Sequence, residues 1–164
     1  MWSYIFFLAF LSLAFAAWQD DRMRNCCNSN RVNIRSDCRW LCRYYNSKSD
    51  VLCNLERCGS QMQKFVYCAS DVSDNKRCCQ NSNMPSQCVR FCNPWTTPNV
   101  NEMTQKKYLT CLNYLNTIAN CHRNNLNTER AYWYNDRQYF DNTQMNFWAQ
   151  TRARVAMAHA CNGR

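Results

Sequence analysis

The chain has 164 residues, 14 of them cysteine, and a formal net charge of +9 at pH 7. Two glycines and three prolines are too few for a collagen-like or low-complexity protein. With 46% hydrophobic and 19% charged residues, the composition is not that of a disordered chain. A short chain with this cysteine content is typical of an extracellular disulfide scaffold.

Residues 1–16 predict a secretory signal peptide. They carry no charged side chain, and their apolar stretch is too short to span a bilayer comfortably. Ala14 and Ala16 put small residues where a signal peptidase cleaves, so we expect cleavage after Ala16, with Ala17 as the close alternative. Residues 17–25 then lead into the cysteine-rich region. No later segment is apolar enough to cross a membrane, so the mature protein is expected to be secreted and soluble.

Twelve of the cysteines form two copies of one pattern. Residues 26–68 read CC-x10-C-x3-C-x15-C-x9-C, and residues 78–121 read CC-x8-C-x3-C-x18-C-x9-C. The repeat predicts one cysteine-rich domain over 26–121, built from two related halves. Ser36 and Ser86 each stand two residues before a C-x3-C motif, where either could cap a helix.

Apolar residues recur at helical spacing in both halves, and Gly59 is a weak point in the first series. The two series are Leu52, Leu55, Cys58, Met62 and Phe65, then Tyr108, Leu112, Leu115, Ile118 and Ala119. The scarcity of Gly and Pro argues against a chain of tight hairpins. We therefore predict an all-α, mainly helical, small disulfide-rich domain with two pseudo-repeated halves and a C-terminal extension.

Helix geometry limits how the cysteines can pair. Residues four apart on a helix rise about 6 Å and residues ten apart about 15 Å, whereas bridged Cα atoms lie roughly 5.5 Å apart. Two straight adjacent helices therefore cannot bond both cysteines of C-x3-C to both of C-x9-C. We expect at least one bond in each half to use the CC pair or to reach the other half, and each CC pair to tie two different elements.

All cysteines are expected to form disulfides, because their number is even and the protein is expected to be exported. They are Cys26, Cys27, Cys38, Cys42, Cys53, Cys58, Cys68, Cys78, Cys79, Cys88, Cys92, Cys111, Cys121 and Cys161. Cys53 and Cys161 are left over from the repeat, and we predict that they bond each other. Pairing between two chains, or exchange with cysteines of the repeat, are the alternatives.

Several residues between the cysteines carry a family resemblance. Cys68-Ala69-Ser70-Asp71, Cys78-Cys79, Pro85-Ser86-Gln87-Cys88 and Cys92 stand in one run, and 111–121 reads CLNYLNTIANC. Over about 26–121 the chain resembles the DB module of nematode secreted proteins. The resemblance implies an extracellular disulfide-bonded domain and implies no activity. Cys53, Cys161 and everything after His122 fall outside it.

Residues 122–164 form an aromatic and polar C-terminal extension. The favoured interpretation is an added helix whose aromatic residues pack on the domain. The alternative is a partner-binding surface, because aromatic residues and arginine are enriched in binding hot spots. The candidate surface residues are Trp133, Tyr134, Phe147 and Trp148.

No catalytic, cofactor or metal site is predicted. The sequence has no C-x2-C, H-E-x-x-H or G-x-S-x-G motif. His122 and His159 are the two histidines, and a pair of histidines can act as base and acid in a ribonuclease. Neither lies in a motif of that chemistry, so exposed or structural histidines are the favoured interpretation.

We therefore expect a secreted, non-enzymatic extracellular binding module, either a ligand or a matrix-associated protein. Its positive charge favours an extracellular protein or an acidic glycan as partner, and no nucleic-acid partner is expected. A cationic host-defence or membrane-active protein is the first alternative, although no basic amphipathic helix is evident. A two-histidine ribonuclease-like enzyme is the second.

Overall fold

The computed structural model describes residues 18–126. The predicted signal peptide 1–16 lies outside this range, as does most of the predicted extension 122–164. Predicted residues outside the described range are Trp133, Tyr134, Phe147, Trp148, His159 and Cys161.

The first half consists of helices that carry five of its six repeat cysteines, and the sixth, Cys42, directly follows one of them. A helical segment over 18–28 is followed by the 3₁₀ helix η1 (Ser36–Leu41) and by α2 (Lys48–Cys58). The short 3₁₀ helix η2 (Gly59–Gln61) then leads into α3 (Met62–Ala69). Gly59, the predicted weak point, is therefore where the α-helical hydrogen bonding changes to 3₁₀.

The second half follows the same plan with two further helical elements. Its elements are α4 (Lys76–Asn81), α5 (Ser86–Val89), η3 (Arg90–Cys92), α6 (Val100–Met103), α7 (Lys106–Leu109), η4 (Thr110–Tyr114) and α8 (Leu115–Asn124). The succession α7, η4 and α8 matches α2, η2 and α3 in the first half, because both are α-helices interrupted by a 3₁₀ turn. No strand occurs among residues 18–126, which confirms the all-α prediction. None of the helices in this range has the length and apolar character needed to cross a bilayer.

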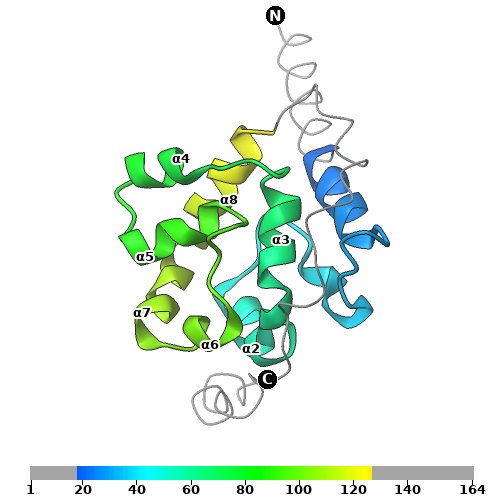
Figure 1. The fold of residues 1–164 in the computed structure, drawn as a ribbon, viewed down its shortest axis with the longest axis horizontal. Coiled ribbons are helices and arrows are strands. Elements are labelled where there is room, and N and C mark those ends of the chain that lie inside the picture. The colour runs from blue at the N-terminus through cyan, green and yellow to red at the C-terminus, as the bar shows by residue number, and fades with distance from the viewer. Residues whose placement is uncertain (1–17, 127–164) are drawn as a thin grey trace, which may run out of the picture.

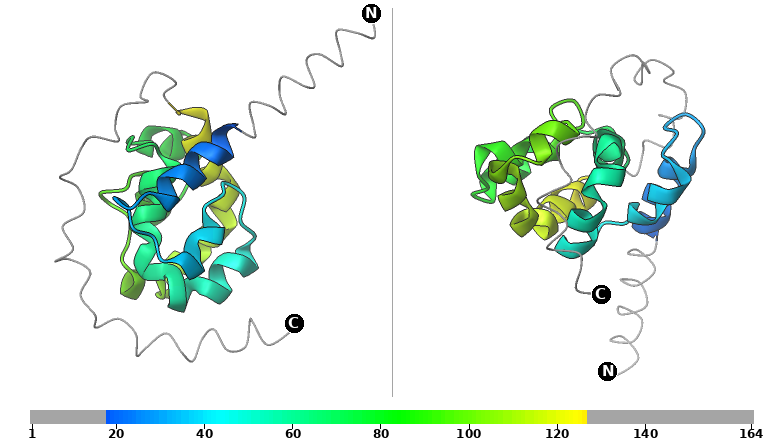
Figure 2. Two further views of the ribbon diagram at one scale, coloured as in Figure 1. Left: turned by 90° about the vertical axis from the view of Figure 1, so that its right-hand side faces the viewer. Right: turned by 90° about the horizontal axis from the view of Figure 1, so that it is seen from below.

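Figure 1 shows α3 in the middle of the molecule, with the helical segment 18–28 on one side of it and α4, α5, α6 and α7 on the other. The views of Figure 2 agree with this order. Helix α8 packs against both α3 and α4, so the last helix of the second half reaches the first half. The contact between the halves therefore runs along α2 and α3 on one side and along η4 and α8 on the other.

Each half closes on itself through three disulfides with the same connectivity. The bonds are Cys26–Cys68, Cys27–Cys42 and Cys38–Cys58 in the first half, and Cys78–Cys121, Cys79–Cys92 and Cys88–Cys111 in the second. In both halves the first cysteine bonds the sixth, the second bonds the fourth and the third bonds the fifth. The two cysteines of each CC pair bond different elements, as expected for adjacent cysteines. None of these six bonds joins one half to the other.

Cys53 is also disulfide-bonded. The partner predicted for it, Cys161, lies outside the described residues.

The prediction that Ser36 and Ser86 cap helices is wrong. Each is the first residue inside its helix, and the caps are Arg35 and Pro85, without a side-chain hydrogen bond. A true capping box occurs instead at Ser47, whose hydroxyl accepts from the Asp50 amide while the Asp50 carboxylate accepts from the Ser47 amide.

Candidate ligand cavity between the two halves

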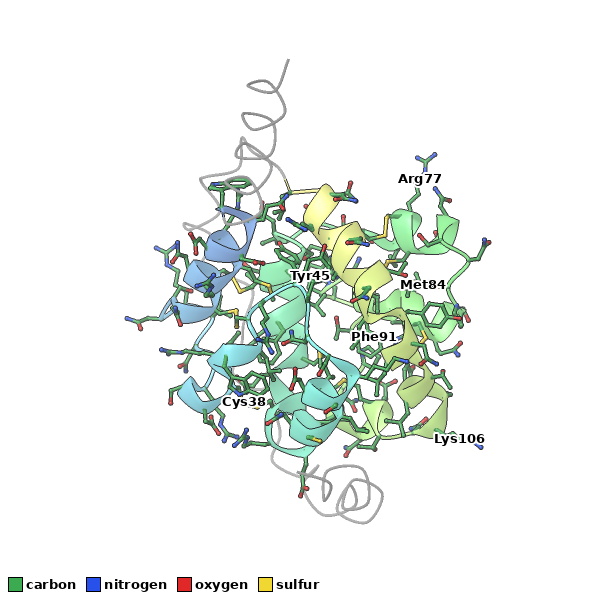
Figure 3. The ribbon with its side chains drawn as sticks, turned by 180° about the vertical axis from the view of Figure 1, so that it is seen from behind. Cys38, Tyr45, Arg77, Met84, Phe91 and Lys106 are labelled. Carbon is green, nitrogen blue, oxygen red and sulfur yellow. A yellow bond between two sulfur atoms is a disulfide. The ribbon has the colours of Figure 1, made fainter. Side chains whose placement is uncertain are left out.

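The two apolar stripes found in the sequence face each other across the boundary between the halves. Leu55, Cys58, Met62 and Phe65 lie on the first-half side, and Tyr108, Leu112, Leu115, Ile118 and Ala119 lie on the second-half side. They do not fill the space between them. A cavity of about 140 Å³ remains, and its walls come from both halves. Phe91, labelled near the centre of Figure 3, also lines it.

The cavity wall is overwhelmingly apolar and includes three methionines. Met23 comes from the helical segment 18–28, Met62 from α3 and Met103 from α6. Methionine side chains are unbranched and change rotamer easily, so they can adjust to an occupant. The disulfide Cys38–Cys58 fixes one wall and Cys88–Cys111 fixes the other. The disulfides therefore fix the backbone around the cavity, whereas the methionine side chains in its wall can change conformation.

The polar side chains that line the interior of the cavity already have hydrogen-bond partners. The Tyr44 hydroxyl donates to the Ala69 carbonyl at 3.0 Å, and burial raises the pKa of that phenol. The Tyr108 hydroxyl accepts from the Arg90 guanidinium. These groups therefore offer little to a polar ligand or to water, since their hydrogen bonds are directed elsewhere.

His122 is the third interior polar group, and it is 2% exposed. The Phe91 carbonyl can only accept, so the ring Nε2 donates to it at 3.0 Å, and Nδ1 accepts from the Asn75 amide at 2.9 Å. Burial lowers the pKa of His122 to about 4, and the hydrogen bond to Phe91 opposes this shift. The neutral ring therefore joins α8 to η3 and to the residue that precedes α4.

One part of the cavity wall is open to solvent. Arg43 is exposed, and eight other lining residues are half-buried: Asn46, Val51, Asn54, Met62, Phe91, Leu109, Leu112 and Leu115. They come from both halves, and we call the part formed by Arg43, Asn46, Val51, Asn54 and Leu112 the mouth.

The polar side chains at the mouth are bound to one another. Arg43 donates to Asn46 at 2.9 Å and to the Asp50 carboxylate at 3.2 Å. Asn54 donates to the Asp50 carbonyl at 2.7 Å and accepts from Arg57. The charge of Arg43 is thus balanced by Asp50, and the mouth does not present an uncompensated cation.

Polar contacts and apolar packing, rather than the six described disulfides, join the two halves. Lys48 donates to the Asn113 amide oxygen at 2.5 Å, and the Tyr45 hydroxyl donates to Asn120 at 2.8 Å. Arg123 donates to the Tyr45 hydroxyl at 2.8 Å. These bonds are partly or fully exposed and can be exchanged for water at modest cost. The mouth can therefore widen without breaking any of the six described disulfides.

A second feature lies on the surface, where three exposed aromatic side chains pair with arginines. One pair is Trp18 with Arg22, at 5.4 Å, and the other two involve the segment from 40 to 45. Trp40 is 42% exposed, and the Arg43 guanidinium lies 5.6 Å from the centre of its ring. Tyr45 is 46% exposed, and Arg123 lies 5.5 Å from its ring centre. Figure 3 shows Tyr45 beside α8. We call Trp40, Arg43, Tyr45 and Arg123 the aromatic–arginine cluster.

The candidate site residues predicted from the sequence lie in different places. His122 lies inside the protein, and the four aromatic candidates for a partner surface lie outside the described residues. The sequence analysis missed the aromatic–arginine cluster. Its signal was present in the run from Trp40 to Tyr45, which holds three aromatic residues and one arginine within six positions.

Three comparisons with known proteins complete the description of the domain. Comparison with curated proteins and with solved structures gives no match. The family model of the DB module matches residues 26–122, which is more than half of the chain. A DB module with this many disulfides fits a small cysteine-rich domain of the extracellular space, and the chain belongs to the DB-module family.

Proposed function

We propose that this chain is a secreted, non-enzymatic extracellular binding module whose partner is an extracellular protein with an acidic surface. The observation that carries the proposal is the aromatic–arginine cluster. Trp, Tyr and Arg are the residues most enriched in the hot spots of protein interfaces. Trp40, Arg43 and Tyr45 are exposed and Arg123 is half-buried, on a frame that the six described disulfides hold rigid. Little conformational entropy is therefore lost when they are covered.

The charge of the chain supports a partner of opposite sign. A net charge of +9 steers acidic surfaces toward the protein and speeds their association. The basic residues are spread along the sequence without a long run, which favours a protein over a sulfated glycan.

The state of His122 supports a non-catalytic role. A general acid or base must reach the substrate, directly or through one water. The ring of His122 is buried and both its nitrogens are engaged within the protein. Its low pKa leaves it neutral at pH 7, so it is not poised to donate a proton.

The alternative of a membrane-active protein has less support from the charge pattern of the helices. A helix that lies on an anionic membrane typically carries lysines and arginines along one polar face. Helix α2 instead carries a mixture of signs, with Lys48, Asp50, Glu56 and Arg57. Asp50 is moreover bound to Arg43, so part of the basic charge beside this helix is compensated.

The proposal is tested by a binding screen of the oxidised protein against extracellular receptor domains and heparin, followed by two matched variants. Trp40→Ala should weaken binding to the captured partner at least tenfold. Trp95→Ala is the control, because Trp95 is 43% exposed and lies outside the cluster. Its affinity should stay within twofold of the unmodified protein.

Several outcomes would contradict the proposal. Capture by heparin alone would replace the protein partner with a glycan. Unchanged affinity in Trp40→Ala would place the interface outside the cluster, and an equal loss in both variants would show that the effect is not specific to the cluster. RNA turnover or liposome leakage by the purified protein would favour the enzymatic or the membrane-active alternative.

A further inference from the structure

We propose that the cavity between the two halves is a binding site for a small, neutral, apolar molecule with the size of one aromatic ring or a short alkyl chain. This inference goes beyond the proposed function, because it gives the same domain a second class of ligand. It rests on the volume of the cavity, on the chemistry of its wall and on the way the two halves are joined.

The volume decides the size of the ligand. A cavity of about 140 Å³ is far larger than the few voids, barely larger than a water molecule, that protein interiors ordinarily contain. An apolar cavity of about 150 Å³ in another protein stays dry and binds benzene. Sites for drug-sized ligands begin at about 300 Å³. The cavity therefore suits a single ring or a short chain and excludes a large lipid or a peptide.

The wall decides the chemistry of the ligand. The interior hydroxyls of Tyr44 and Tyr108 and both ring nitrogens of His122 are already hydrogen-bonded within the protein. A charged or strongly polar ligand would lose its hydration without gaining a partner, which costs several kcal/mol in general. At the mouth, Arg43 is paired with Asp50, so an anionic head group finds no free cation there. A neutral apolar molecule meets none of these penalties.

An empty cavity of this kind is costly for the protein. In core substitutions, unfolding becomes easier by about 24 cal/mol for each Å³ of cavity left behind. Ala69 and Ala119 both lie in the wall, and replacing either with a larger apolar residue would fill part of the cavity. The two small residues instead keep the cavity open where α3 and α8 meet.

A ligand can enter the cavity at the boundary between the two halves. All six described disulfides lie within one half or the other. Lys48 and Tyr45 close the outer side of the mouth through exposed hydrogen bonds to Asn113 and Asn120. Hydrogen bonds of Arg123 and apolar packing also join the halves, but none of the six described disulfides does, so the halves can separate slightly and admit a ligand with these bonds intact.

The experiment uses the full oxidised chain labelled with ¹³C at the methionine methyl groups, and the probe is 1-hexanol. Met23, Met62 and Met103 line the cavity, whereas Met84 is buried in the core of the second half and serves as the internal reference. We expect saturable shifts of the three cavity methyl signals and no change at Met84. Hexanoate, which has the same chain length and a negative charge, should bind at least tenfold more weakly.

Two neighbouring positions on α2 provide the matched variants. Val51 lies at the mouth, so Val51→Trp should lower the affinity for 1-hexanol at least tenfold by filling the entrance. Leu52 does not line the cavity, so Leu52→Trp should bind as the unmodified protein does. If Val51→Trp fails to fold, the titration of the unmodified protein still decides the question.

Absence of saturable shifts in the unmodified protein would overturn the proposal, as would shifts of equal size at Met84. Equal affinity for hexanoate would overturn the assignment of a neutral ligand. The screen for a protein partner is a separate measurement, so a failure here leaves the proposed function standing, and a failure there leaves the cavity site standing.

Discussion

Mild acid should destabilise this protein through His122. The folded protein holds the ring neutral, with a pKa of about 4, because the ring is buried between Asn75 and the Phe91 carbonyl. In the unfolded chain the pKa returns to its ordinary value of about 6.5. As the pH falls, the unfolded chain binds its proton first, so stability is highest above pH 6.5 and declines until about pH 4.

The size of the effect follows from the two pKa values. A lowering of about 2.5 units corresponds to roughly 3 kcal/mol once the pH is below both values. Between pH 7 and pH 5 the same linkage gives a loss of about 2 kcal/mol. Asp and Glu side chains remain largely ionised over that interval in both states, so the loss in this window belongs mainly to histidine.

The assay is urea unfolding of the oxidised protein at several pH values between 7.5 and 5. His159→Gln should keep the decline, whereas His122→Gln should remove it, because glutamine does not titrate. If His122→Gln does not fold, ring ¹⁵N shifts of the unmodified protein report the same property, and the signals of His122 should not move down to pH 5. A free energy of unfolding that stays constant within about 0.5 kcal/mol from pH 7 to 5 would refute the argument.

Three further predictions concern the frame. A methyl group on Gly59 would lie 2.9 Å from Val100 Cγ2. Gly59→Ala should therefore lower the free energy of unfolding by about 1 kcal/mol, although alanine has the better helix propensity. In urea titrations, the double variant with Val100→Ala should recover part of this loss. Alkylation of the denatured, unreduced secreted protein should add no mass, and uptake of even one alkyl group would show a free thiol. Peptide mapping without reduction should find Cys53 joined to Cys161 within one chain, a loop worth roughly 4 to 5 kcal/mol at most; a bond from either to a repeat cysteine or to a second chain would contradict this.

The repeat of cysteine spacings was sufficient to predict two related helical halves, because a disulfide framework and a helical period both leave a direct trace in the sequence. The pairing left no such trace. Whether Cys38 bonds Cys58 or Cys68 depends on how η1 lies against α2 and α3, which spacing alone does not define.

The burial of His122 and the cavity were beyond the reach of the sequence for different reasons. The partners of His122 are 47 and 31 residues away, and one of them is a backbone carbonyl. The helical spacing of the series with Leu112 and Leu115 was recognised in the sequence, but an apolar stripe does not reveal how completely the opposite stripe fills the space. The error at Ser36 and Ser86 had a local cause, because each helix begins one residue earlier than the serine suggested.

The separate closure of the two halves also bears on how the disulfides are acquired. Six cysteines can pair in 15 ways, and the first half needs no cysteine beyond Cys68 to complete its set. Cys78 follows Cys68 by ten positions, so the first set can be finished while the second half is still being synthesised. The order of synthesis then limits the oxidative search at first to the cysteines of residues 26–68, which are the six of the repeat and Cys53.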